Sequence, residues 1–277
     1  MEFKISNTFD TKERIKELVR NLIYLNEKNT SDLSNINWVT PLSILPIAYY
    51  INKNSKIIEK LPNNNVASYL KTIGFPEGRD EIIENFNEYD FKNYLPILKI
   101  KFNQNDNFET LEQIIEKYIN ILKRTILKDS KQYEINSVKY MLGEIITNIN
   151  EHSSADEVYI LAQSWSKDME ITIIDNGKGA LGSYQSCFDI KTHLEALDLI
   201  QQSLSSKDPT GNERGYGIFS TKKLSIQPFN GEVVIFSGDA MLYNDLIFNV
   251  PFDFNGFMFS MKLKKEVEPF DMYKYLE

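Results

Sequence analysis

Apolar and polar residues follow a helical spacing near the start of the chain and an extended one soon after. Across residues 11–27 the apolar positions recur three and four apart, which predicts an amphipathic helix. A short strand is expected at 33–39. Pro41 then opens a second helix, because proline is tolerated in the first helical turn. A further strand is expected at 56–61.

The pattern weakens after a short helix expected at 66–73, which Gly74 would end. The segment that follows is polar and aromatic, apart from an apolar stretch at 94–102 that predicts an edge strand. We therefore place a domain boundary at 103–107. The first domain, 1–104, would be a small α/β unit.

Beyond this boundary, helical and extended patterns alternate again. Residues 108–127 and 136–151 have amphipathic helical spacing, whereas 158–174 alternates around a polar turn, as a hairpin does. Helices are expected at 192–204 and 218–224. Three closing strands complete an α+β fold in which helices cover an antiparallel or mixed sheet. These strands are expected at 232–237, 241–250 and 257–263.

The composition is that of a soluble folded protein. Of the 277 residues, 42% are hydrophobic and 25% are charged, which excludes extended disorder and a membrane bundle. The length suits two modest domains. A net charge of -8 argues against a protein that coats nucleic acid or an anionic membrane, so neither is expected as a partner.

Cysteine and histidine are scarce in the chain. The single cysteine, Cys187, cannot form an intramolecular disulfide, and with His152 and His193 alone it cannot build a structural zinc cluster. A reducing cytoplasm is therefore the expected compartment.

Three polar motifs carry candidate chemistry, and the first lies on the helix expected at 136–151. Glu144, Asn148 and Glu151 fall in one narrow arc, away from the apolar stripe of that helix. A solvated helix face would show the same row, so this motif needs support from its surroundings.

The second motif, Asp175-Asn-Gly177-Lys178-Gly179, follows directly on a predicted strand. A carboxylate at a strand end can accept a hydrogen bond from a buried amine such as that of adenine. The glycines let a base approach the backbone closely. A simple Asp-Asn-Gly turn is the alternative.

The third motif is the glycine-rich segment 211–217, which leads into the helix expected at 218–224. Backbone amides at a helix start, with Arg214 beside them, suit the binding of phosphate oxygens. A surface loop would look similar.

Together and in this order, the three motifs resemble the GHKL (Bergerat-fold) superfamily of ATPases, which includes gyrase B subunits and histidine kinases. The resemblance covers residues 106–265. Residues 144–152 are similar to the family's N box, 175–179 to its first glycine box and 215–217 to its second, and 256–263 resembles its closing strand.

The resemblance implies a histidine-kinase-like ATP-binding domain at 105–265, followed by a C-terminal tail at 266–277. The domain would be a two-layer α/β sandwich with a mixed sheet. Glu144 would be the catalytic base that activates the attacking water or hydroxyl. Asn148 would hold Mg²⁺ through its amide oxygen, and Asp175 would bind the adenine amino group of ATP.

The remaining motif residues would surround the nucleotide. By the same resemblance, Gly177 and Gly179 would shape the adenine pocket, and 180–213 would form a lid. Residues 214–217 would meet the phosphates. The cofactor contacts would be completed by Glu151, Lys178, Arg214, Gly215, Tyr216 and Gly217.

Within the superfamily, the segment from Asn148 to His152 is most similar to the anti-sigma-factor serine kinases. A histidine autokinase would need a phosphoacceptor histidine before its ATPase domain, and no histidine precedes His152. His152 is expected to pack or cap at a helix end, and His193 to lie in the lid.

The N-terminal segment resembles STAS-like domains, the fold of anti-sigma-factor antagonists, at 32–38, 41–50 and 66–75. Residues 39–42 stand where that family's phosphoacceptor segment, Asp-Ser-x-Gly, would be. An unrelated α/β domain that binds or senses a partner is the alternative.

The function expected from these features is Mg²⁺-dependent ATP hydrolysis coupled to a protein partner. Two alternatives remain open: a protein serine/threonine kinase of the anti-sigma-factor type, and a non-catalytic module whose interactions ATP controls. A homodimer through the lid or the helix at 108–127 is a further option.

Overall fold

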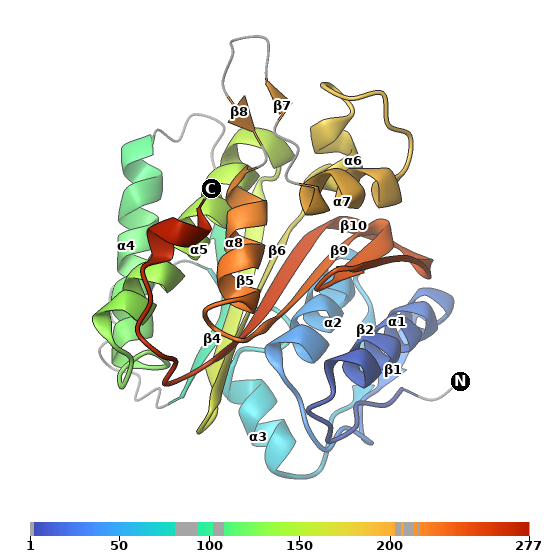
Figure 1. Cartoon of the computed structure of the whole chain (residues 1–277). Helices are drawn as coiled ribbons and strands as arrows, with labels where there is room; N and C mark the ends of the chain where they lie inside the picture. Colours follow the sequence, from blue (N-terminus) through green and yellow to red (C-terminus); the bar gives the residue numbers. More distant parts are fainter. Residues whose placement is uncertain are drawn as a thin grey trace.

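One six-stranded sheet lies at the centre of the computed structural model, between two layers of helices (Figure 1). The structure describes residues 3–80, 93–101, 108–202, 206–207, 213–214 and 216–276. The strand order is β3-β4-β5-β6-β10-β9, in which β3 and β4 are parallel and the other neighbours antiparallel. The expected α+β class with a mixed sheet is confirmed.

The strands of this sheet are β3 (Arg79–Asp80), β4 (Tyr94–Lys101), β5 (Glu157–Ser164), β6 (Asp168–Asp175), β9 (Glu232–Tyr243) and β10 (Leu246–Lys264). Two short two-stranded sheets are formed by β1 (Thr30–Asp32) with β2 (Ile57–Lys60) and by β7 (Ser206–Lys207) with β8 (Glu213–Arg214).

The helices of the first half are α1 (Thr11–Glu27), α2 (Pro41–Lys53), α3 (Asn65–Thr72) and α4 (Phe108–Arg124). Those of the second half are α5 (Gln132–Asn148), α6 (Gly179–Tyr184), α7 (His193–Gln201) and α8 (Tyr216–Ile226). A π-helix, Ile149–Ser153, extends α5, and a 3₁₀-helix, Met272–Tyr275, lies near the end of the chain.

Both faces of the sheet are buried. On β5, Val158 and Ile160 face the core shared with α4, α5, α7 and α8, whereas Tyr159 and Leu161 face the core shared with α1 and α2. This explains why the strand reads as a nearly continuous apolar run. The second-half helices form the expected two-layer arrangement with the sheet, and the first-half helices cover its other face (Figure 1).

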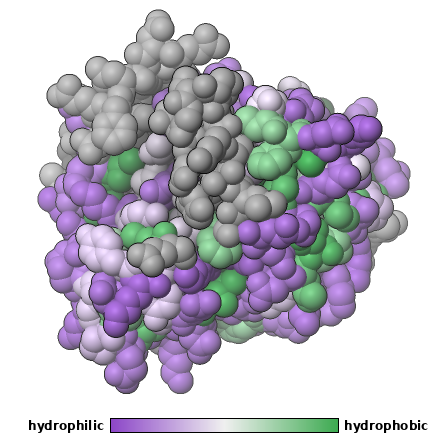
Figure 2. All heavy atoms as spheres, turned by 45° about the horizontal axis from the view of Figure 1, so that its top comes forward, coloured by the Kyte–Doolittle hydropathy of each residue, from purple (hydrophilic) through white to green (hydrophobic). Residues whose placement is uncertain are grey.

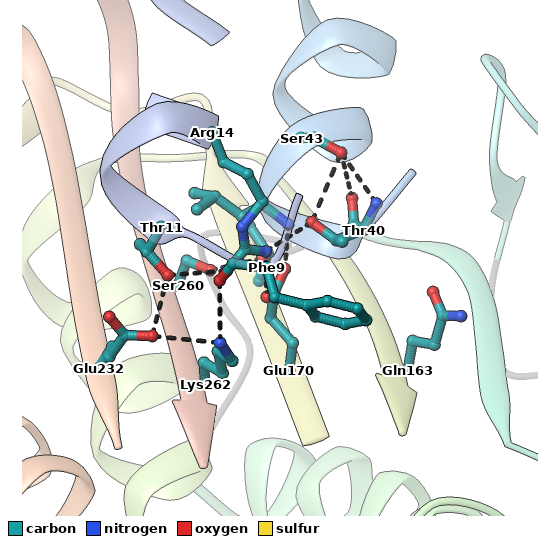
Figure 3. A network of polar contacts seen from close by, with 12 residues as sticks. Phe9, Thr11, Arg14, Thr40, Ser43, Gln163, Glu170, Glu232, Ser260 and Lys262 are labelled. Carbon is teal, nitrogen blue, oxygen red and sulfur yellow. Dashed lines mark hydrogen bonds and ion pairs between the residues drawn. The ribbon is translucent and has the colours of Figure 1, made fainter. Parts of the chain in front are cut away.

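A buried polar network joins α1 and α2 to the sheet (Figure 3). Arg14 of α1 donates to Glu170 of β6 over 2.6 Å, and both side chains are almost fully buried. Arg14 also donates to Thr40, and the other oxygen of Glu170 accepts from the backbone N–H of Leu42 at the start of α2. Each carboxylate oxygen is therefore used, as a buried charge requires.

The domain boundary expected at 103–107 lies outside the described residues. β4, which precedes this boundary, and β5, which follows it, pair in the same sheet. Residues beyond 265, expected as a tail, pack on the helical layer: the Phe270 ring meets those of Tyr133 and Phe229.

Three strand predictions were wrong in detail. The stretch 94–102, expected as an edge strand, forms β4, which lies between β3 and β5. The strand expected at 33–39 lies earlier, at Thr30–Asp32, because the Asp32 carboxylate accepts from the backbone N–H of Ser34 and turns the chain there. The strand expected at 241–250 is divided between β9 and β10 by a tight turn in which Asn244 has a φ of +52°.

None of the described helices is long and apolar enough to cross a membrane.

Candidate functional site

A cavity lies where the C-terminal end of β6 meets the C-terminal end of α5. These two ends lie near α6 and α7 (Figure 1). Figure 2 brings this part of the molecule forward and shows a mostly hydrophilic face with apolar residues in patches. The cavity is lined by Ile145, Asn148, Ile149, His152, Ser153, Asp175, Gly179, Ala180, Ser183, Tyr184, Ile200, Ile218 and Phe257. Its wall is therefore largely apolar, with a few polar groups.

Asp175 is the polar group at the inner end of this cavity. As the last residue of β6 it is held between Val158 of β5 and Phe257 of β10, and its side chain is fully buried. Its Oδ1 accepts from the backbone N–H of Gly177 at 2.7 Å, whereas its Oδ2 has no hydrogen-bond partner among the described residues. A buried carboxylate oxygen without a partner is costly, unless a ligand supplies the donor.

The protonation of Asp175 is set mainly by burial. Desolvation raises the pKa of this carboxyl from its ordinary value of 3.8 to about 7, against the opposing effect of the Gly177 N–H. Near neutral pH the group can therefore gain or lose a proton, which is typical of residues in functional sites.

The two glycines after Asp175 are required by close backbone contacts. A Cβ on Gly177 would lie 2.2 Å from the carbonyl oxygen of Ser153, in the π-helix. Gly179 has a φ of +68°, and a Cβ there would lie 2.7 Å from Ser237 Oγ. The N–H of Lys178 donates to the same Ser153 carbonyl at 2.8 Å. The loop is thus held against the end of α5.

Glu144 and Asn148 meet the start of α8, and Asn148 also lines the cavity. A Cβ on Gly217 would lie 2.1 Å from Glu144 Oε2 and 2.9 Å from Asn148 Nδ2, so a side chain at this position has no room. Asn148 Nδ2 donates to the carbonyl of Glu144 at 2.6 Å. This bond leaves the amide oxygen of Asn148 to other partners.

Glu144 is partly buried and is held by the hydroxyl of Tyr140. Desolvation raises the pKa of its carboxyl, the Tyr140 hydrogen bond lowers it, and the charge of Glu151 raises it further. A carboxylate in such surroundings is a stronger base than an exposed one.

The structure brings together five of the residues expected from the sequence: Glu144, Asn148, Asp175, Gly179 and Gly217, with Gly177 directly behind them. Glu151 and Lys178 do not line the cavity, although the charge of Glu151 acts on Glu144. Glu151 and Lys178 are exposed, and Glu151 lies 3.4 Å from the ring of His152.

The remaining expected residues are only partly described. Arg214 is in β8 and Tyr216 begins α8, but their side chains and the whole of Gly215 lie outside the described residues. Of the expected lid at 180–213, the described parts are mainly helical and form α6 and α7.

Some cavity residues were not expected from the sequence. Phe257 had a signal, since it opens the predicted closing strand and pairs directly with Asp175. Tyr184, Ile200 and Ile218 had none, because their contacts join segments far apart in the chain. The sequence matches no protein-family model and no curated protein.

Proposed function

We propose that this chain is a Mg²⁺-dependent ATP-binding protein of the GHKL type that hydrolyses ATP and couples its nucleotide state to a protein partner. The observation that carries the proposal is the buried carboxylate of Asp175, which lines a largely apolar cavity and whose Oδ2 has no hydrogen-bond partner among the described residues. Asn148, which lines the same cavity, and Glu144, which meets Gly217 beside Asn148, support the proposal.

The adenine base fits the inner part of the cavity. Ile145, Ile149 and Phe257 offer apolar surface to a flat ring, and the exocyclic amine would donate to Asp175 Oδ2. The Gly177 N–H fixes the carboxylate through Oδ1, so its orientation is set before the ligand binds. Such preorganisation lowers the entropic cost of binding.

Asn148 fits a role as the protein's ligand to Mg²⁺. Its Nδ2 is committed to the Glu144 carbonyl, which leaves its oxygen, a hard donor, for a cation. The described residues contain no group of three or more His, Cys, Asp or Glu that could hold a metal. The phosphates and water would therefore complete the octahedron, and the ion would neutralise phosphate charge.

Glu144 is the residue proposed to take the proton from the attacking water. It meets Gly217 at the start of α8 beside Asn148, which lines the cavity. Because burial raises its pKa, its carboxylate is a better proton acceptor than an exposed one. Tyr140 holds it in place.

The biological setting of the proposal comes mainly from the resemblance. It includes a protein partner and a STAS-like N-terminal segment, whereas the cytoplasmic location is proposed from the scarcity of cysteine. The kinase of the anti-sigma-factor type and the ATP-gated module differ from the ATPase in where the γ-phosphate goes, so one experiment separates all three.

That experiment follows γ-labelled ATP with the full chain, with and without a candidate partner. Released phosphate supports the ATPase, label on protein the kinase, and binding without transfer the ATP-gated module. Glu144→Gln should keep nucleotide binding and slow turnover by about 100-fold or more. Glu59→Gln, which removes an exposed carboxylate on β2, is the matched control. Undiminished turnover in Glu144→Gln would remove its role as the base.

A further inference from the structure

His193, the first residue of α7, lies in a slot between two glycines. A Cβ on Gly238 of β9 would lie 2.1 Å from its Cδ2, and a Cβ on Gly179 would lie 3.1 Å from its Cε1. Thr192 caps α7 by accepting from the backbone N–H of Glu195, which fixes the helix start. The ring therefore occupies space that side chains at Gly179 and Gly238 would otherwise fill.

A hydrogen-bonded chain runs from this ring to the wall of the cavity. His193 Nδ1 lies 2.9 Å from Ser237 Oγ, and Ser237 Oγ accepts from the backbone N–H of Ala180 at 2.8 Å. Ser237 is completely buried, and Ala180, in the first turn of α6, lines the cavity beside Asp175.

Which groups donate and which accept in this chain of hydrogen bonds depends on the charge of His193. A backbone N–H can only donate, so Ser237 Oγ must accept from Ala180 and has one hydrogen left to give. A neutral ring with the hydrogen on Nε2 accepts that hydrogen at Nδ1. A charged ring would instead donate from Nδ1, and the Ser237 hydrogen would lose this acceptor.

We propose that His193 is a positioning residue for the nucleotide cavity: in its neutral Nε2–H form it holds Ser237, which holds the start of α6 beside Asp175. When His193 gains a proton, the Ser237 hydroxyl turns away, α6 loosens and nucleotide binds more weakly. The expected effect on nucleotide binding rests on the proposed function. The chain of hydrogen bonds is independent of it.

The charges around His193 allow this form at neutral pH. Burial lowers the pKa of the ring below its ordinary value, and the carboxylates of Asp239 on β9 and Asp253 on β10 oppose that effect. On its own helix, the Glu195 carboxylate accepts from the backbone N–H groups of Lys191 and Thr192. Lys178, which precedes α6, is exposed.

The first test measures the binding of a non-hydrolysable ATP analogue with Mg²⁺ at several pH values. His193→Asn places an acceptor oxygen near the position of Nδ1 and does not titrate, so at pH about 7.5 its Kd should stay within about twofold of the wild type. His193→Phe and Ser237→Ala should bind about five- to tenfold more weakly, since each leaves a buried polar group unpaired.

The pH profile separates positioning from mere packing. Protonation of Asp175 weakens binding in the wild type and in His193→Asn alike, so the ratio of their Kd values isolates His193. We expect the wild type to lose more affinity than His193→Asn as the pH falls toward about 5.5. Equal profiles, or wild-type affinity in folded His193→Phe, would overturn the proposal.

The second test needs no nucleotide. The chain has two histidines, so long-range ¹H–¹⁵N spectra of the wild type and His152→Gln assign the ring of His193. The expected result is the Nε2–H tautomer, with faster exchange of the Ala180 amide in His193→Phe. An Nδ1–H tautomer, or unchanged exchange of the Ala180 amide in His193→Phe, would overturn the proposed chain of hydrogen bonds. If the wild type binds no ATP while these spectroscopic results hold, the proposed function is contradicted and the chain of hydrogen bonds is not.

Discussion

Asp175 connects the stability of the chain to its proposed function at the scale of one residue. Its carboxyl has a pKa of about 7 in the folded chain and 3.8 as its ordinary value. Between these values the folded state keeps a proton that the unfolded state has lost. The titration of Asp175 by itself therefore lowers the free energy of unfolding as the pH rises from about 4 to 7, by about 4 kcal/mol at most, and has no further effect above that range.

Asp175→Asn should stabilise the protein at pH 8 and abolish nucleotide binding. The amide oxygen can still accept from Gly177, whereas the buried charge is gone. Denaturant unfolding should show a gain of about 1–3 kcal/mol at pH 8 that disappears near pH 4. Asp189→Asn, at an exposed position, is the control and should change little. A variant less stable than the wild type at pH 8 would mean that the carboxylate is structural.

The contact between α5 and α8 brings the proposed base to the cavity at the scale of elements. Gly217 allows it, because a side chain there would overlap Glu144 and Asn148. Gly143, next to Glu144 on the same helix, is different: apart from its chain neighbours and the nearby backbone of its own helix, no described atom lies within 4 Å of the place where its Cβ would be. The two glycines therefore make a matched pair.

Gly217→Ala should displace the start of α8, destabilise the chain by about 1–3 kcal/mol and remove most ATP turnover. Gly143→Ala should leave turnover unchanged and stabilise α5 by about 0.5–1 kcal/mol, because alanine is the better helix former. Thermal unfolding and phosphate release measure both effects. Equal behaviour of the two variants would contradict the close contact at Gly217.

The sequence was most informative where an element has its own periodicity. The helix predicted at 11–27 is α1, and the hairpin predicted at 158–174 is β5 and β6. The π-helix at Ile149–Ser153 has no such spacing, yet it carries the Ser153 carbonyl against which Gly177 packs. Contacts of this kind join distant segments, so Asp175 and its glycines could be predicted, whereas the apolar wall of Tyr184, Ile200 and Ile218 could not.

At the scale of the whole molecule, the two halves of the chain share one sheet. Tyr159, Leu161 and Phe236 are buried against the first-half helices, and β4 pairs with β5. The Arg14–Glu170 pair adds a buried charged contact between the same layers. The N-terminal segment thus forms the core on the face of the sheet opposite the cavity.

A fragment of residues 105–277 should not fold as the full chain does. It would lack β4 and expose the apolar face that α1 and α2 cover, a large patch of the kind that promotes aggregation. We expect weak near-ultraviolet circular dichroism, dye binding and no cooperative unfolding. A fragment that unfolds cooperatively and binds nucleotide would show that 105–277 is an independent domain.

The central claim, an adenine nucleotide site built on Asp175, is tested most directly by calorimetric titration of the full chain. The titrant is a non-hydrolysable ATP analogue with Mg²⁺ at pH 8. The account predicts saturable binding at one site per chain in the wild type and none in Asp175→Asn, whose folding is verified by cooperative unfolding. Equal binding by both proteins, or no binding by the wild type, would contradict it.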